Sequence, residues 1–173
     1  MQELSLNIMD VAQNSIVAGA TLITIHAACH GDRLTVEISD NGKGMSEEQL
    51  AHVTDPFFTT RTTRKVGLGV PLFKMQAELT GGMFSIDSQT GIGTHLKAEF
   101  VTSHVDMIPL GDLNQTILLL ITCNPDLDFV FIHDTDETTF TLDTRELREV
   151  LGGEVPLNDP AVTQWIREAL EEG

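Results

Sequence analysis

The spacing of apolar residues changes early in the chain, from a helical period to strict alternation. Between Glu3 and Val17, apolar side chains recur three and four positions apart, which predicts an amphipathic helix that ends near Gly19. Residues 21–26 and 34–38 then alternate apolar and polar positions, on either side of the turn-forming His30-Gly31-Asp32. This pattern predicts a β-hairpin directly after the helix.

Two more helices and a second pair of strands are predicted before residue 104. Ser46-Glu47-Glu48-Gln49 has the form of a capped helix start, and Gly81-Gly82 has the form of a helix end. Together with the alternation of apolar residues, these signals place a helix at 46–53, a polar basic loop at 59–66, a helix at 67–79, and strands at 83–87 and 95–101.

Residues 105–173 are predicted to form a small α+β appendage with its own elements. The run 117–121 is apolar on all sides, so the helix that contains it, from Asp112 to Ile121, should be buried. A hairpin over 129–142 and helices beginning near Asp143 and Asp159 follow. The last helix carries an apolar stripe made of Val162, Trp165, Ile166, Ala169 and Leu170. We expect this stripe to pack inside the protein. Alternatively, it forms a surface for a protein partner or a homodimer, with Trp165 at its centre.

The net charge of −16 is unevenly distributed along the chain. Residues 1–104 carry 11 acidic and 7 basic side chains, whereas residues 105–173 carry 15 and 3. So acidic a chain is not expected to bind nucleic acid or an anionic membrane, and its tail favours a basic protein partner. Three of the basic residues, Arg61, Arg64 and Lys65, fall within five positions. They form a candidate anion site, although a solvated loop would have the same composition.

Targeting and redox features point to the cytoplasm. No apolar run is long enough to span a membrane, and no secretory signal is present at the start. The two cysteines, Cys29 and Cys123, lie far apart and form neither a ligand cluster nor a disulfide framework. A reducing, cytoplasmic location is therefore the expectation.

Polar residues gather at two places where chemistry is plausible. Asn7, Asp10 and Asn14 are three and four positions apart, so they share one stripe of the first helix. An asparagine carbonyl suits Mg²⁺, and a carboxylate one turn away can bind or activate a water, although a solvated stripe is the alternative. The glycines that open helix 67–79 leave backbone N–H groups available to an anion.

The segment Asp40-Asn41-Gly42-Lys43-Gly44 follows the second strand. Taken alone, it is typical of a tight hairpin turn, because Asn-Gly favours positive φ. Its interpretation changes when the other motifs are considered with it. Five segments, in this order along the chain, resemble the motifs of the GHKL (Bergerat-fold) ATP-binding superfamily. This superfamily includes gyrase, Hsp90, histidine kinases and MutL. The five segments are residues 14–21 (N box), 40–44 (G1 box), Pro56-Phe57-Phe58-Thr59-Thr60 (the F box of sensor histidine kinases), Gly67-Leu68-Gly69 (G2 box) and Gly91-Ile92-Gly93-Thr94.

The resemblance covers residues 3–102 and implies a fold and a ligand. The fold is an α/β two-layer sandwich, with a mixed sheet and helices on one face, to which residues 105–173 would add the appendage. The ligands are ATP and Mg²⁺. Asn14 would coordinate Mg²⁺, Asp40 would accept a hydrogen bond from the adenine amino group, and Thr94 would hold the associated water. Gly42 and Gly44 would let the backbone approach the base.

The resemblance also assigns the phosphate end of the ligand. Residues 60–66 would form the ATP lid, and the G2 box, Gly67, Leu68 and Gly69, would receive the phosphates. Candidate lid contacts to the phosphates are Thr60, Arg61, Arg64 and Lys65. The lid departs from sensor kinases in having Lys65-Val66 where Gly-Thr is usual.

The fate of the γ-phosphate depends on Asp10. Hydrolysing members of the superfamily have a glutamate general base at this position, so Asp10 permits hydrolysis; its alternative role is to hold a Mg²⁺ ligand in place. The last lysine is Lys97, which disfavours a gyrase- or MutL-type transducer, and no helical hairpin with a phospho-acceptor histidine precedes the first helix. We therefore expect a stand-alone signalling module that acts in trans as a protein kinase or ATP-gated regulator. The alternatives are an ATPase with a conformational switch and a non-catalytic nucleotide-sensing adaptor.

Overall fold

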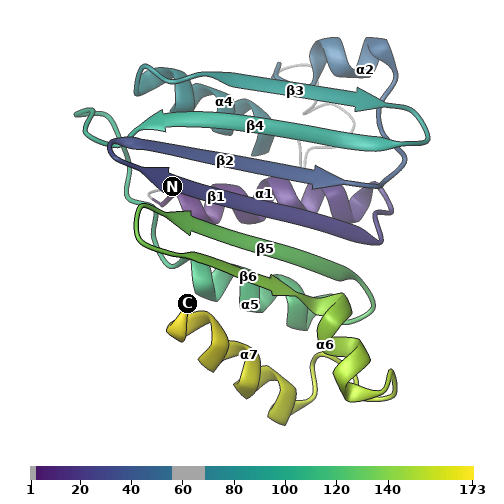
Figure 1. Cartoon of the computed structure of the whole chain (residues 1–173). Helices are drawn as coiled ribbons and strands as arrows, with labels where there is room; N and C mark the ends of the chain where they lie inside the picture. The colour runs from purple at the N-terminus through teal and green to yellow at the C-terminus, as the bar shows by residue number, and fades with distance from the viewer. Residues whose placement is uncertain (1–2, 56–68) are drawn as a thin grey trace.

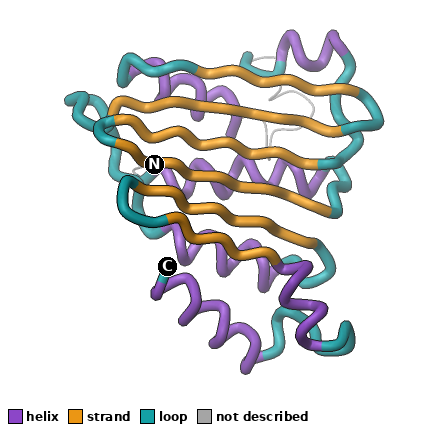
Figure 2. Tube along the Cα trace, viewed as in Figure 1, coloured by secondary structure: helices purple, strands orange, loops and turns teal. Residues whose placement is uncertain are grey.

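Helices cover one face of a six-stranded sheet whose strand order is β3-β4-β2-β1-β5-β6. The computed structural model describes residues 3–55 and 69–173. Figure 1 shows α1, α4 and α5 behind the sheet, α2 at the β3 end, and α6 and α7 at the β6 end. Figure 2 shows the same two layers by secondary structure. The expected mixed α/β sandwich with helices on one face is confirmed.

The predicted first helix and hairpin are both present. Helix α1 (Leu4–Val17) buries Leu4, Ile8 and Ala12, and Gly19 follows it with φ of 80°. Strands β1 (Leu22–His30) and β2 (Arg33–Asp40) are antiparallel. Strand β1 continues four residues past its predicted end, because Ala27 to His30 pair with β2 even though they have little intrinsic strand preference.

The next elements complete the half of the sheet that contains β3. They are α2 (Glu47–His52), α4 (Gly69–Leu79), β3 (Phe84–Gln89) and β4 (Gly93–Val101). The predicted capping box is formed at α2, where Ser46 and Gln49 exchange hydrogen bonds. Strand β4 pairs with β3 on one side and with β2 on the other. Phe73 of α4 meets Phe100 of β4 edge to face, with ring centroids 5.5 Å apart, and so attaches α4 to the sheet.

Residues 105–173 extend this same sheet. They form α5 (Leu113–Cys123), β5 (Asp128–Thr135), β6 (Thr139–Asp143), α6 (Thr144–Leu151) and α7 (Pro160–Glu172). Strand β5 runs parallel to β1, and one apolar core continues from α1 to α7. The backbone N–H groups of Leu4 and Ser5 donate to the carbonyls of Pro109 and Leu110. The domain boundary at residue 104 stays a prediction.

None of the helices in the described part of the chain combines the length and the apolar character needed to traverse a bilayer.

Arg148 of α6 fixes the start of β5. Its Nε donates to Asp128 at 2.7 Å, and its Nη2 donates to the carbonyls of Pro125 and Leu127, each at 2.7 Å. Because these acceptors are partly buried, Arg148→Ala should lower the free energy of unfolding by about 1–2 kcal/mol in urea denaturation. Arg167→Ala is the control, since Arg167 is exposed and donates to the side chain of Gln164 on its own helix. Equal losses in the two variants would contradict this role for Arg148.

Candidate functional site

The polar stripe of α1 lies against the first turn of α4. The Asn7 amide is buried and donates to the carbonyl of Gly69 at 3.1 Å. A Cβ atom added at Gly69 would stand 3.3 Å from the Cβ of Asp10, so a larger residue there would crowd Asp10. The structure therefore brings Asn7, Asp10 and Gly69 together.

Two side-chain carbonyl oxygens of this stripe lack hydrogen-bond partners within the described part of the chain. Oδ1 of Asn7 and Oδ1 of Asn14 are buried without a partner among residues 3–55 and 69–173. A buried acceptor left unpaired is unfavourable, which makes such atoms candidates for binding a ligand or ion. Amide oxygens are acceptable ligands for Mg²⁺. The stripe therefore fits the ion that the resemblance implies.

No group of three or more histidine, cysteine or carboxylate side chains in the described ranges could hold a metal. A magnesium ion at α1 would consequently depend on an amide oxygen, waters and oxygens of its own ligand. This arrangement is ordinary for Mg²⁺, which keeps several waters and is commonly held together with substrate phosphates.

Asp10 lies one turn before Asn14 on α1. Its side chain is exposed, but neighbouring atoms remove part of its hydration, and this desolvation raises the pKa of the carboxyl above its ordinary value. A raised pKa makes the ionised carboxylate a stronger base. The position therefore suits proton abstraction from a nearby water.

Asp40 stands at the end of β2, where its carboxylate is held from two sides. The Ser15 hydroxyl of α1 donates to Oδ2 at 2.6 Å, and the backbone N–H of Gly42 donates to Oδ1 at 2.8 Å. In the sheet register Asp40 is opposite Thr94, whose hydroxyl lies 2.8 Å from that of Ser88. Asp40 and Thr94 are therefore neighbours, as the roles predicted for them require.

Gly42 and Gly44 are needed for packing of the protein itself. A Cβ atom at Gly42 would stand 2.9 Å from the Cβ of Ala18. Gly44 has φ of 72°, and a Cβ atom there would collide with the backbone carbonyl of Gln89. The close neighbours of both glycines are thus the α1 end and the β3–β4 turn. Room for a base beside them stays a prediction.

Three further side chains organise this site. Ser15 orients Asp40, and Ser88 accepts from the N–H of Met45 while it donates to the carbonyl of Gly93. Asn41 accepts from the N–H groups of Thr21 and Leu22 through Oδ1 and donates to the Thr21 hydroxyl. Ser15 and Asn41 lie inside the N and G1 boxes, so the motifs included them without indicating their partners. Nothing in the sequence pattern singles out Ser88.

A hollow of about 650 Å³ opens beside Asp40 and Thr94, at the ends of β2, β3 and β4. It also reaches Ser39 and His95, on the sheet face that α1 and α4 do not cover. There the Ser39 hydroxyl lies 2.6 Å from Nδ1 of His95. This hollow therefore runs along the ends of these strands, and most of the residues that line it are polar.

The remaining predicted contacts lie outside the described residues. They are the F box at 56–60 and the candidate phosphate-binding residues Thr60, Arg61, Arg64, Lys65, Gly67 and Leu68.

Sequence comparison identifies the family. Residues 1–104 match the family model for histidine kinase-, DNA gyrase B-, and HSP90-like ATPases. Sensor histidine kinase RcsC of Salmonella typhimurium is 30% identical over 77 residues, which are 42% of this chain and 8% of RcsC. The C4-dicarboxylate transport sensor protein DctB of Pseudomonas aeruginosa is 41% identical over 69 residues, 39% of this chain and 10% of DctB. Sensor protein DegM of a Bacillus species is 34% identical over 89 residues, which are 50% of this chain and 24% of DegM.

The matched part is thus less than a quarter of the length of each of these relatives.

Solved structures extend the comparison of folds over more of the chain. The Aquifex aeolicus MutL ATPase domain, complexed with ADP, superposes with a TM-score of 0.56 over 97% of this chain and 88% of that one, at 11% identity. The N-terminal domain of a DNA repair protein superposes with a TM-score of 0.56 over 82% of this chain and 52% of that one, at 14% sequence identity. At these identities the likeness shows the fold alone. The sequence match over residues 1–104 shows that this chain belongs to the family of histidine kinase-, DNA gyrase B- and HSP90-like ATPases.

Proposed function

We propose that this protein binds Mg-ATP and acts in trans, as a protein kinase or an ATP-gated regulator of a protein partner. The observation that carries the proposal is the Asp40 carboxylate, fixed by Ser15 and Gly42 beside Thr94. A carboxylate oriented in this way is a pre-organised acceptor at the position where the family recognises adenine. The proposed setting is the cytoplasm.

The Asp40 carboxylate retains capacity for a ligand. Each of its oxygens accepts one hydrogen bond from the residues that the structure describes, while an ionised carboxylate offers about four acceptor sites. The adenine amino group would take one of the remaining sites, and the Thr94 hydroxyl would hold a water between the base and the sheet. A guanine base has a carbonyl group where adenine has its amino group. That carbonyl would face the Asp40 carboxylate unfavourably, because both groups are hydrogen-bond acceptors.

The other end of the nucleotide would lie between α1 and α4. Oδ1 of Asn14 would hold Mg²⁺, which when bound neutralises phosphate charge and orients the γ-phosphate. The first turn of α4 at Gly69 would present backbone N–H groups to the phosphates. Arg61, Arg64 and Lys65 would add positive charge from the lid.

A second candidate function is ATP hydrolysis coupled to a conformational switch. It is favoured by the desolvated Asp10, one helical turn from Asn14. Incubation with γ-labelled ATP, with and without extract from the source cells, separates the two candidates. Label transferred to another protein supports the kinase, and free phosphate supports the ATPase. ATP binding without either product would leave the non-catalytic adaptor, and absence of ATP binding would overturn the proposal altogether.

Asn14→Ala should remove the magnesium dependence of ATP binding. Its carbonyl is the unpaired oxygen that we assign to Mg²⁺, so the variant should bind ATP equally well in magnesium and in EDTA. We expect its affinity in magnesium to be about tenfold below that of wild type, which corresponds to about 1.4 kcal/mol. Calorimetric titration measures both values. Asn14→Asp keeps an oxygen ligand and is the matched control; an alanine variant that retained the magnesium effect would refute the metal role.

A further inference from the structure

An apolar groove lies at the opposite end of the sheet from Asp40. It encloses about 490 Å³ between β6, α6 and α7. Leu142, Leu147 and Val162 are buried in its lining, whereas Val150 and Trp165 line it while they remain 82% and 52% exposed. Large apolar side chains this exposed around a concave surface are typical of a contact site for another molecule.

One side of the groove is the free edge of the sheet. Strand β6 is the last strand and pairs with β5 alone within the described ranges, and its residues Thr141, Leu142 and Asp143 line the groove. The unpaired edge of such a strand offers backbone N–H and C=O groups to an additional strand. The groove therefore combines apolar side-chain contacts with an open hydrogen-bonding edge.

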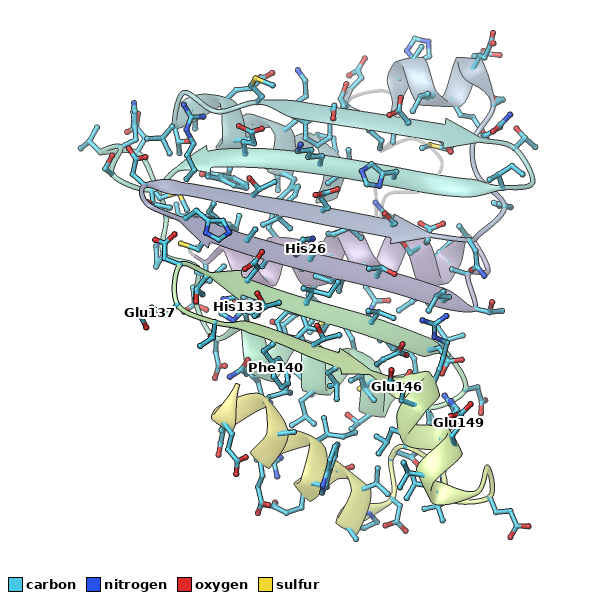
Figure 3. All side chains as sticks on the ribbon, in the orientation of Figure 1. His26, His133, Glu137, Phe140, Glu146 and Glu149 are labelled. Atoms are coloured by element: carbon cyan, nitrogen blue, oxygen red, sulfur yellow. The ribbon has the colours of Figure 1, made fainter. Side chains whose placement is uncertain are left out.

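The charges around the groove are negative. Its lining contains Asp143 and Glu146 and includes no lysine or arginine. Figure 3 shows Glu149 on α6 near Glu146. Arg145 pairs with Asp143 at 2.9 Å and so offsets the charge of that carboxylate, and Arg148 pairs with Asp128 at 2.7 Å. The negative charge beside the groove therefore comes from Glu146 and Glu149.

This charge distribution decides which occupant fits. Residues 105–173 carry 15 acidic and 3 basic side chains, so a second copy docked here would bring like charge against like charge. A basic segment would meet opposite charge.

We propose that the groove binds an extended basic segment of a partner protein, which adds to β6 as a further strand. Because alternate residues of a strand point to opposite sides, apolar side chains would enter the groove against Trp165 and Val150, and lysines or arginines would alternate with them. The site is independent of the proposed nucleotide chemistry, so its test neither requires ATP nor depends on ATP binding.

The test uses the full chain and a fluorescent ten-residue peptide that alternates valine and lysine. Fluorescence anisotropy should detect binding that weakens as salt is added. Trp165→Ala should weaken binding by about 10- to 30-fold, as is common for a central tryptophan. Glu146→Gln should weaken it less and reduce the salt dependence. Val105→Ala and Glu171→Gln are the matched controls, since both positions are exposed and outside the groove, and they should bind as wild type does.

Peptide variants test the contacts separately. A lysine–serine peptide keeps the charge and should bind at least tenfold more weakly, and a valine–glutamate peptide should not bind. N-methylation of alternate backbone amides on the edge that would pair with β6 should abolish binding. Should Trp165→Ala be unfolded by circular dichroism, Val150→Ser, at the more exposed position, removes an apolar contact without adding charge and provides the same test.

Several results would overturn the proposal. They are absence of binding by the valine–lysine peptide, equal binding by the lysine–serine peptide, and binding unaffected by both Trp165→Ala and Val150→Ser. Tolerance of backbone methylation would exclude strand addition. A dimer in sedimentation experiments that Val150→Asp dissociates would assign the groove to a second copy of the chain.

Discussion

Replacing Asp40 by asparagine should weaken ATP binding by about 10- to 150-fold. The proposed hydrogen bond from the adenine amino group to a charged acceptor is worth about 1.5–3 kcal/mol, which corresponds to that range. Asparagine also disturbs the arrangement that orients the side chain. Ser15 and the N–H of Gly42 donate to different oxygens of the carboxylate, and an amide can offer an acceptor to only one of them.

Calorimetry with ATP and with ADP measures the effect, and both nucleotides should lose affinity equally because they share adenine. Ser15→Ala is the matched control: it keeps the charged acceptor but removes one of the two groups that orient it. We expect this variant to bind ATP with a loss smaller than that of Asp40→Asn. Wild-type affinity in Asp40→Asn, with a normal unfolding transition, would refute the adenine assignment.

The local elements of this fold could be predicted from sequence because their signals are local. The apolar period of α1, the turn between β1 and β2, and the capping box of α2 each depend on residues a few positions apart. The Bergerat motifs added the order of the elements and the family. None of these signals reports which strands become neighbours over a long separation.

The pairing of β1 with β5 illustrates that limit. Leu22 is opposite Asp128 and Cys29 is opposite Thr135, so the two strands are about a hundred positions apart in sequence. Alternation indicates that both segments are strands, but it carries no information on their partner. The tail therefore reads as an appendage, although its strands continue the main sheet.

Helix α7 shows a second limit. Its apolar stripe was predicted as a unit, yet Val162, Ile166 and Leu170 are buried while Trp165 is half exposed. Residues four apart align along one face, and Trp165 lies on the flank of that face. The sequence identifies the helix, but packing against α5 and the position of β6 decide which flank stays uncovered. The same reasoning applies to Ser15 and Asp40, whose contact arises from the packing of α1 on the sheet.

Asp10→Asn should lower any ATP hydrolysis by about 10²–10⁴-fold and leave ATP affinity unchanged. The carboxylate is proposed to abstract a proton from the attacking water, and an amide cannot accept that proton. Because partial desolvation raises the pKa of Asp10, wild-type hydrolysis should increase as pH rises through that raised pKa and decrease about tenfold per pH unit below it. The variant should show no such dependence. Phosphate release across pH 4–9, with calorimetry at each end, measures both properties.

The same raised pKa predicts a stability effect that is independent of catalysis. An acid whose pKa is higher in the folded than in the unfolded state destabilises the fold when it ionises. The free energy of unfolding of the nucleotide-free wild type, compared with that of Asp10→Asn at the same pH, should therefore fall as pH rises from the ordinary to the raised pKa of Asp10. At neutral pH the variant should unfold at a higher temperature than wild type. A variant that hydrolyses ATP as fast as wild type would exclude Asp10 as the base, whereas identical stability profiles would show that Asp10 is not desolvated in solution.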